Sequence, residues 1–350
     1  MKIVFDNLAF SIQKAGGVSA VWSALISGIP KKFILKYIDW NNENIFYDQT
    51  IMDSSKIVKR QSFYPKFQRL KTFKLNYSKK FIFHSSVYRI CDNVNAKNVI
   101  TVHDFIDIKF NKNILLRSLR WFFMKKSIVN SDAIICVSHN TKNDLLKYLP
   151  KVDRTKINVV HNGVSDCFHQ IDSSYSDENF LLYVGGRQSY KNFHILIKVL
   201  EKLNGYTLKF IGGGKLTNKE KLLLDKSLHN RYTHIQSINN YDLNLLYNKA
   251  FCLVYPSIYE GFGLPLIEAQ SSGCPVIATK ISSFPEIVGN SAILLNNMNT
   301  DNIISAVKVL ENPANRNKYV RLGLKNSKRF SYDLMTKKYL DIYKKVWSGI

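Results

Sequence analysis

Two glutamates, Glu260 and Glu268, lie eight positions apart in the segment 255–275. Between them the chain passes through a loop with two glycines and a proline, in the order Gly261, Phe262, Gly263, Leu264 and Pro265. Glycine lets backbone amides approach a ligand closely, and Pro265 can occupy the first position of a helix, where its missing N–H costs nothing. We therefore expect a helix to begin at this loop, with Glu260 before it and Glu268 about one turn inside it.

This segment can bind two chemically different parts of one ligand. Carboxylates accept hydrogen bonds from hydroxyl groups, whereas the amides and the dipole at a helix N-terminus attract phosphate. Glu260 and Glu268 should both be able to reach the same bound molecule. The pattern therefore indicates a ligand that carries hydroxyls and phosphates together, such as a sugar nucleotide.

A second group of charged residues follows the predicted strand 180–184. The chain continues through Gly185, Gly186 and Arg187, and Lys191 opens the next helical pattern. A planar guanidinium and a compact ammonium both suit a diphosphate, although surface arginines and lysines are also common. A glycine run at 212–214 is followed by Lys215 without the spacing of a P-loop, so we interpret it as a turn at a strand end.

Two further strand ends, at residues 2–5 and 99–102, carry candidate contacts. His103 could project into a ligand site and bind a substrate hydroxyl, or it could be a surface histidine beside a capping residue, Asp104. Gly16 and Gly17 precede a helical pattern, and this pair suits either a phosphate or sugar close to the backbone or a tight turn. Open parallel sheets bind ligands beyond the carboxyl ends of their strands, which is where these residues lie.

The elements that position these residues alternate along the chain. The predicted strands are residues 2–5, 36–38, 81–84, 99–102, 133–137 and 157–160, then 180–184, 207–211, 232–236, 251–255, 276–278 and 292–294. The helical patterns are residues 18–29, 115–127, 141–148, 194–203, 219–228, 242–249 and 300–310. This alternation predicts an α/β fold with two doubly wound parallel sheets, joined near the polar stretch 166–179. Residues 331–347 form a last amphipathic pattern, whose apolar face could consist of Leu334, Tyr339, Leu340, Ile342, Tyr343 and Val346.

The chain is strongly basic. The 350 residues carry a net charge of +24, and between Asp53 and Asp92 there are ten Lys or Arg and no acidic residue. Aromatic residues are interleaved there, and again among the basic residues of 117–126. Such a surface suits an anionic membrane, a plain solvated face or a nucleic acid. We find no RNA-binding motif and expect no nucleic acid partner.

Other features restrict the cellular setting. The five cysteines lack metal-binding or disulfide-like spacing, no apolar run is long enough to span a membrane, and the chain opens directly on a strand pattern. These features favour a reducing cytoplasm.

Nearly the whole chain resembles the retaining glycosyltransferases of family 4, which have the GT-B fold. The blocks that carry the resemblance are residues 5–7, 13–19, 83–86, 102–105, 137–145, 160–164, 183–192 and, most specifically, the E-x7-E block at 255–275. The resemblance implies two Rossmann-like domains that face a cleft, with the C-terminal helix crossing back to the first. The expected domains are 1–165 plus 331–350, which faces acceptor and membrane, and 166–330, which binds the nucleotide sugar.

The same resemblance implies a role for each matching residue. Glu260, with amides at Gly261, Phe262 and Gly263, should hold hydroxyls of the donor sugar, and Glu268 should bind the ribose. The diphosphate should be neutralised by Arg187 and Lys191, with amides near Gly16, Gly17, Gly186, Leu264 and Leu266. His103 should contact the transferred sugar. The base should lie near Gln236 and Ile238.

The expected function is transfer of a hexose, mannose-like or rhamnose-like, from a nucleotide-diphosphate sugar with retention of configuration. The acceptor should be a glycan, for example one linked to undecaprenyl diphosphate, in O-antigen, capsule or lipopolysaccharide synthesis. The sequence has no Asp-x-Asp triplet, so we expect neither metal nor cofactor. Segments 56–80 and 117–126 should dock on the anionic inner face of the cell membrane. The alternatives are a GT-B sugar-nucleotide epimerase or hydrolase, and a non-catalytic binding protein or partner subunit.

Overall fold

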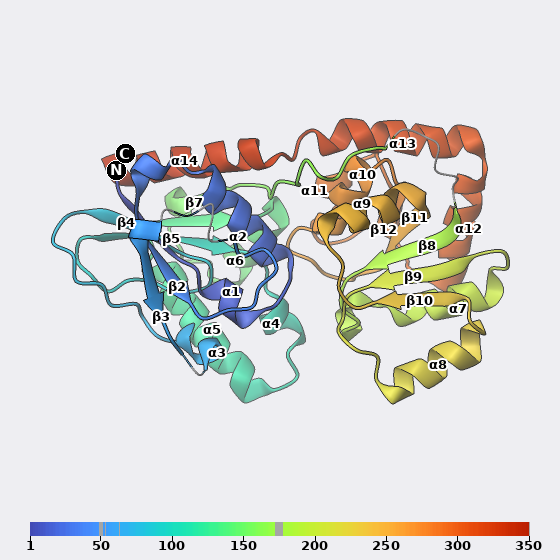
Figure 1. The fold of residues 1–350 in the computed structure, drawn as a ribbon, viewed down its shortest axis with the longest axis horizontal. Helices are drawn as coiled ribbons and strands as arrows, with labels where there is room; N and C mark the ends of the chain where they lie inside the picture. The colour runs from blue at the N-terminus through green and yellow to red at the C-terminus, as the bar shows by residue number, and fades with distance from the viewer. Residues whose placement is uncertain (49–51, 53, 63, 172–177, 350) are drawn as a thin grey trace. The chain divides into compact units, whose positions relative to one another are not determined.

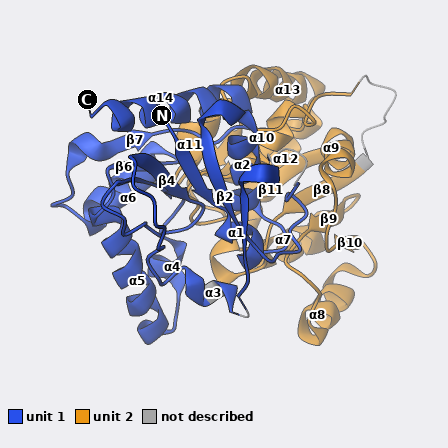
Figure 2. Cartoon of the chain, turned by 60° about the vertical axis from the view of Figure 1, so that its left-hand side comes forward, with its two compact units in different colours: residues 1–163, 332–350 blue, residues 164–331 orange. Residues whose placement is uncertain are grey.

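The computed structural model describes residues 1–48, 52, 54–62, 64–171 and 178–349 of the chain. These residues form two compact units, Met1–Gly163 with Tyr332–Ile350, and Val164–Ser331 (Figure 2). The first boundary lies two residues before the position expected from the sequence, and the second lies one residue after it. Part of the expected join, residues 172–177, lies outside the described residues.

Unit 1 is built on a parallel sheet with the strand order β3-β2-β1-β4-β5-β6-β7 (Figure 1). Its strands are β1 (Ile3–Asp6), β2 (Ile34–Trp40), β3 (Ile57–Arg60), β4 (Phe81–Ser85), β5 (Ala96–Val102), β6 (Ala133–Cys136) and β7 (Ile157–Val159). Its helices are α1 (Leu8–Ile12), α2 (Gly17–Gly28), α3 (Pro65–Gln68), α4 (Ile106–Phe110), α5 (Ile114–Val129), α6 (His139–Tyr148) and α14 (Tyr332–Ser348).

Unit 2 repeats this plan with the strand order β10-β9-β8-β11-β12-β13. Its strands are β8 (Glu178–Val184), β9 (Thr207–Ile211), β10 (Tyr232–Ile235), β11 (Ala250–Tyr255), β12 (Val276–Thr279) and β13 (Ile293–Leu295). Its helices are α7 (His194–Lys202), α8 (Asn218–Leu228), α9 (Asn240–Lys249), α10 (Leu264–Ser271), α11 (Phe284–Val288), α12 (Thr300–Glu311) and α13 (Pro313–Ser327). The expected α/β class with two doubly wound sheets is confirmed.

Each sheet has one point where the strand order reverses. The reversal lies between β1 and β4 in unit 1 and between β8 and β11 in unit 2. Because crossovers between parallel strands are right-handed, helices on the two sides of this point cover opposite faces of the sheet. The loops diverge there at the carboxyl ends of the strands and leave room for a ligand.

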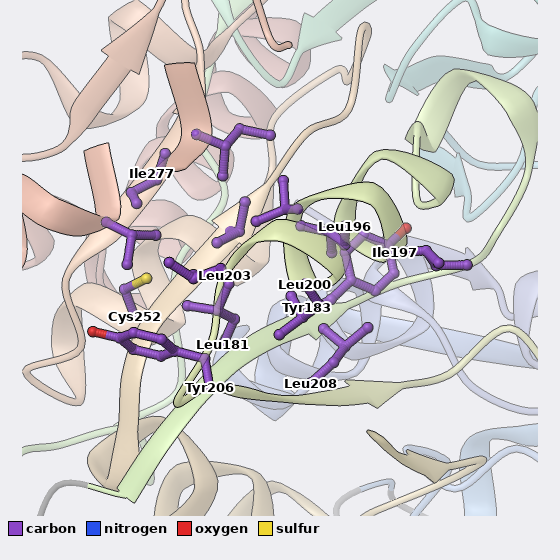
Figure 3. Close-up of a cluster of buried hydrophobic side chains, with 14 of the residues drawn as sticks. Leu181, Tyr183, Leu196, Ile197, Leu200, Leu203, Tyr206, Leu208, Cys252 and Ile277 are labelled. Atoms are coloured by element: carbon purple, nitrogen blue, oxygen red, sulfur yellow. The ribbon is translucent and has the colours of Figure 1, made fainter. Parts of the chain in front are cut away.

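The core of unit 2 explains why its strands read as continuous apolar runs. Side chains of β8 and β9 lie near α7 in Figure 3, and the buried cluster includes Leu181, Leu208, Leu196, Leu200 and Cys252 of β11. Burying a leucine side chain contributes about 1.5–3 kcal/mol, so this layer holds the strands and α7 together.

The last helix, α14, belongs to unit 1. Its buried Tyr343 hydroxyl lies 2.6 Å from Nδ1 of His84, and Thr101 Oγ1 lies 3.0 Å from Nε2 of the same ring. Burial lowers the pKa of His84 to about 3, so the ring is neutral in this network. The predicted apolar face of this helix is correct except for Leu334, which is exposed.

The sequence prediction missed one strand and five helices, and it misplaced two aromatic side chains. The missed elements are the strand β3 and the helices α1, α3, α4, α11 and α13. In the basic segment 56–80, Tyr64 and Phe67 are exposed, but Phe73 is buried in the core and Tyr77 packs against it. Phe63 of this segment lies outside the described residues. None of the helices in the described part of the chain is long and apolar enough to cross a bilayer.

Candidate functional site

The candidate site of unit 2 lies where its strand order reverses. After β8 the chain passes through residues 185–188 into the 3₁₀ turn Ser189–Lys191, and after β11 it passes through residues 256–263 into α10. The backbone amide of Ile258 donates a 2.8 Å hydrogen bond to the carbonyl of Tyr190. This bond ties the two loops together, so their side chains share one site.

Lys191 and Glu260 form the central contact of this site. Lys191 Nζ lies 2.5 Å from Glu260 Oε1, and the two side chains are only 13% and 10% exposed. The Tyr255 hydroxyl donates to the same carboxylate oxygen over 3.0 Å, and the ring centroids of Tyr255 and Tyr190 each lie 5.6 Å from the ammonium. The sequence analysis named Lys191 and Glu260 separately, and the structure brings them together.

Two serines far along the sequence fix the backbone around Glu260. Ser282 Oγ donates to the Glu260 carbonyl over 2.6 Å and lies 3.2 Å from its amide, and Ser283 Oγ donates to the Phe262 carbonyl over 2.9 Å. Ser282 itself has a positive φ of 56°. No motif marks these serines in the sequence, because their role depends on a loop that follows the next strand, β12.

The turn before α10 requires a glycine. Gly263 has a φ of 97°, and a Cβ there would lie 3.1 Å from Leu266 and from Phe284. The helix begins at Leu264, so Pro265 occupies its second position rather than the first position that the sequence suggested. The Leu266 amide, expected to face the ligand, donates instead to the Gly263 carbonyl over 3.0 Å.

Glu268 lies one turn into α10, as expected, and is half-buried. The Tyr247 hydroxyl of α9 donates to its carboxylate over 3.0 Å. Burial raises the pKa of Glu268 to about 7, against a smaller lowering by this hydrogen bond. The charge of this carboxyl therefore changes near neutral pH.

Arg187 is engaged by a neighbouring loop rather than by Lys191 or Glu260. Its Nε donates to Glu220 over 2.8 Å, and its terminal nitrogens donate to the carbonyls of Gly212 and Lys215, each over 3.0 Å. The side chain is 5% exposed, and its hydrogen bond is the main cause that lowers the pKa of Glu220 to about 2. The glycine run 212–214 is a strand-end turn, as predicted.

The remaining predicted donor contacts of unit 2 lie in loops. Gln236 is exposed and Ile238 is half-buried in the loop after β10. The carbonyl of Gly186 accepts a hydrogen bond from the hydroxyl of Tyr183. Gly261 and Phe262 are buried beside Glu260.

In unit 1, His103 lines a cavity of about 210 Å³ at the carboxyl ends of β1, β4 and β5. Gln13 and Val18, which flank Gly16 and Gly17, line the same cavity. Burial lowers the pKa of His103 to about 4, so the ring is neutral at pH 7 and can both donate and accept a hydrogen bond. The structure thus places His103 and the two-glycine turn at one cavity of unit 1.

Among the residues described, no three His, Cys, Asp or Glu side chains gather as a metal ion would require. Several partners of the site residues were not predicted from the sequence, namely Tyr255, Tyr190, Tyr247, Glu220, Ser282 and Ser283. Tyr255 lies inside the block 255–275 and Tyr190 inside the block 183–192, so both could have been found there. The other four contact the site from separate elements.

Two family models match the chain over consecutive segments. The model "Glycosyltransferase Family 4" matches residues 69–166, and "Glycosyl transferases group 1" matches residues 165–328. The O-antigen chain mannosyltransferase RfbU of Salmonella typhimurium is 32% identical over 217 residues, which cover 61% of this chain and 60% of that protein. The aligned part of the chain thus spans about 60% of that relative's length.

Two solved structures match over the full length. Sucrose-phosphate synthase from Thermosynechococcus elongatus superposes with a TM-score of 0.79 and 17% identity, covering 100% of both chains. Anabaena HepE, solved in complex with UDP and glucose, gives a TM-score of 0.76 at 13% identity and covers 99% of this chain and 100% of its own. These two likenesses show the GT-B fold, and the two family models with RfbU show that the chain belongs to glycosyltransferase family 4.

Proposed function

We propose that the protein is a glycosyltransferase that moves a hexose from a nucleotide-diphosphate sugar to a glycan acceptor in bacterial surface polysaccharide synthesis. The ion pair of Lys191 with Glu260 beside the first turn of α10 carries this proposal, because it joins a cation for phosphate to a carboxylate for hydroxyls. The relative RfbU, an O-antigen chain mannosyltransferase, supports a mannose-like sugar and an O-antigen or lipopolysaccharide product.

Binding of the donor breaks the contact between Lys191 and Glu260 and gives each side chain a new partner. In that contact the two charges neutralise each other at 2.5 Å. A bound diphosphate attracts Lys191, and the released carboxylate of Glu260 accepts hydrogen bonds from the sugar hydroxyls. Glu268 binds the ribose, and the base lies at the loop with Gln236 and Ile238. The complex of HepE with UDP and glucose supports a nucleotide and a sugar as joint ligands of this fold.

The transfer breaks the bond between the anomeric carbon and the diphosphate and forms a new bond to an acceptor oxygen on the same face. The acceptor proton passes to the departing phosphate oxygen. Negative charge grows on the diphosphate during this step, and Lys191 with the N-terminal dipole of α10 stabilises it without a metal ion. Arg187 holds the loop 212–215 beside the diphosphate. The neutral ring of His103 binds a hydroxyl of the transferred sugar.

The first unit docks on the anionic inner face of the membrane. Helix α5 exposes an apolar stripe with lysines along it, and the exposed members include Leu115, Leu119, Phe122, Lys125 and Lys126. Apolar side chains enter the headgroup region while lysines attract anionic lipid, at about 1 kcal/mol for each lysine near the surface. Tyr64 and Phe67 of α3 expose further aromatic surface. A lipid-linked acceptor would be reached from this position.

A thermal-shift panel of GDP, UDP, dTDP and ADP tests the proposal across the four common donor bases. A nucleotide at 100 times its dissociation constant adds about 2.7 kcal/mol of stability. We expect one nucleotide to raise the melting temperature and the matching nucleotide sugars to support transfer, with the anomeric configuration retained in the NMR spectrum of the product. Absence of binding by all four nucleotides, or a trapped covalent glycosyl–protein adduct, would contradict the proposal.

A further inference from the structure

Lys191 can be neutralised either by Glu260 or by the phosphates of a ligand. Its ammonium lies 2.5 Å from Glu260 Oε1 and forms no other ion pair within the described residues. The 3₁₀ turn that carries Lys191 is tied to the loop of Glu260 by the hydrogen bond between Ile258 and Tyr190, and this bond keeps the two side chains together. A phosphate that binds Lys191 therefore competes with Glu260 for the same ammonium.

The carboxylate of Glu260 has few other partners. The Tyr255 hydroxyl donates to Oε1 over 3.0 Å, and in the described part of the chain no further donor reaches either carboxylate oxygen. Ser282 binds both the amide and the carbonyl of Glu260, and this holds the carboxylate in its mostly buried position. If Lys191 leaves, Glu260 keeps a single hydroxyl donor for a buried negative charge. Loss of the cation from a buried ion pair is strongly unfavourable.

The substrate and the product of the proposed reaction differ in what they offer this pair. A nucleotide-diphosphate sugar supplies phosphate oxygens to Lys191 and sugar hydroxyls to Glu260, so both charges gain new partners. A free nucleoside diphosphate supplies the phosphates alone, because its ribose hydroxyls are bound by Glu268 in the proposed function. The product therefore gains less from Lys191, since it leaves Glu260 short of donors.

We propose that Glu260 is an internal competitor for Lys191 that weakens binding of the nucleoside diphosphate product and makes the site selective for the sugar nucleotide. Once the sugar has been transferred, Glu260 loses its hydroxyl donors, and its contact with Lys191 re-forms as the product leaves. The inference rests on the proposed function and deepens it, because it assigns product release to a residue of the donor site.

Glu260→Gln tests the competition directly, because it removes the charge and keeps the size of the side chain and an acceptor for Tyr255. Calorimetry on the full chain measures the affinity for three probes: the best-binding nucleoside diphosphate, its sugar nucleotide and inorganic pyrophosphate. We expect E260Q to bind the nucleoside diphosphate about tenfold more tightly than the unmodified protein, as one charge-assisted hydrogen bond allows. Pyrophosphate, which also lacks sugar hydroxyls, should show the same gain.

The sugar nucleotide should gain less from this substitution. In E260Q it no longer has to displace a carboxylate, but its hydroxyls now meet a neutral amide, and such hydrogen bonds are weaker. The ratio of the diphosphate Kd to the sugar-nucleotide Kd should therefore fall about threefold or more. Equal or weaker diphosphate binding in E260Q, or an unchanged ratio, would overturn the proposal.

Tyr255→Phe should change the diphosphate affinity in the opposite direction. The substitution removes the one hydroxyl donor that Glu260 keeps when Lys191 leaves, and the ring can still pack against Phe284, with 5.5 Å between centroids. The diphosphate should bind about threefold or more weakly, and the loss should vanish in Y255F/E260Q, where no carboxylate competes. An equal loss in both backgrounds would contradict the proposal. If E260Q does not fold, unchanged or tighter binding in Y255F overturns it.

Glu201→Gln is the charge-matched control for E260Q. Glu201 is exposed on α7 and forms no ion pair with Lys191. Because an exposed charge is screened, its removal should change the diphosphate affinity by less than about twofold. A gain equal to that of E260Q would assign the effect to net charge and would count against the competition.

These outcomes are distinguishable from failure of the proposed function. Absence of transfer with every nucleotide sugar, together with tighter diphosphate binding in E260Q, would remove the proposed function and leave the competition. Transfer by the unmodified protein, together with unchanged diphosphate affinity in E260Q, would remove the competition and leave the proposed function. Failure of both proteins to bind any diphosphate would remove both.

Discussion

In the proposed function Glu268 binds the ribose, and its pKa of about 7 then predicts that donor affinity depends on pH. Sugar hydroxyls donate to the ionised carboxylate, so ligand binding is tightest above this pKa and weakens as the pH falls through it. Two substitutions alter the titration of this carboxyl in different ways. Glu268→Gln abolishes it, and Tyr247→Phe removes the hydrogen bond that lowers the pKa while keeping the ring.

The size of the effect follows from the ionised fraction. With a pKa of about 7, roughly 90% of Glu268 is ionised at pH 8 and roughly 10% at pH 6. If only the ionised form binds the ribose well, the dissociation constant rises up to about tenfold over this range, or about 1.4 kcal/mol. In Tyr247→Phe the midpoint of Glu268 ionisation moves to higher pH, so the donor affinity at pH 7 is lower than in the unmodified protein.

The assay is a titration of the best-binding nucleotide sugar at half-unit steps from pH 6 to pH 8. A nucleotide sugar is preferable to a free nucleoside diphosphate because a terminal phosphate itself titrates near pH 6, within the pH range of the experiment. Glu268→Gln is the matched control and should give a flat profile. An affinity independent of pH in the unmodified protein, or an equal slope in Glu268→Gln, would refute the reasoning.

Three further predictions follow from the contacts of the site. Lys191→Ala should lower turnover by about 10² or more while EDTA has no effect, and near-normal rates or loss of activity with EDTA would contradict this. Lys191→Met should lower the free energy of unfolding in urea by about 3–5 kcal/mol because it leaves Glu260 buried without its cation, and the double variant K191M/E260Q should regain most of this loss. The exposed side chains of α5 predict that L119S/F122S reduces flotation with anionic vesicles, and unchanged flotation would exclude insertion of this helix.

The strand ends could be predicted from the sequence because parallel strands buried on both faces read as apolar runs. The apolar runs alone predicted that Arg187, Lys191 and Glu260 follow the carboxyl ends of two strands. They did not predict that Lys191 and Glu260 touch, or that Arg187 is held by Glu220. Those contacts depend on how loops after separate strands fold back, and such loops carry no periodic pattern.

Other features were missed for local physical reasons. Helix α13 buries only Gly323 and Ser327, so it has no apolar stripe to reveal it. Strand β3 lies at the edge of the sheet and ends in Lys59 and Arg60, which the composition assigned to a basic surface. Composition also could not show that Phe73 faces the core. Alternation of burial within a basic segment becomes visible only from the packing.

A structure of the protein bound to its nucleotide-sugar donor tests the central claim most directly. We expect the diphosphate within hydrogen-bonding distance of Lys191 Nζ and the first turn of α10, with Glu260 turned from Lys191 to the sugar hydroxyls. A donor whose diphosphate lies away from Gly263, with the contact between Lys191 and Glu260 intact, would contradict it.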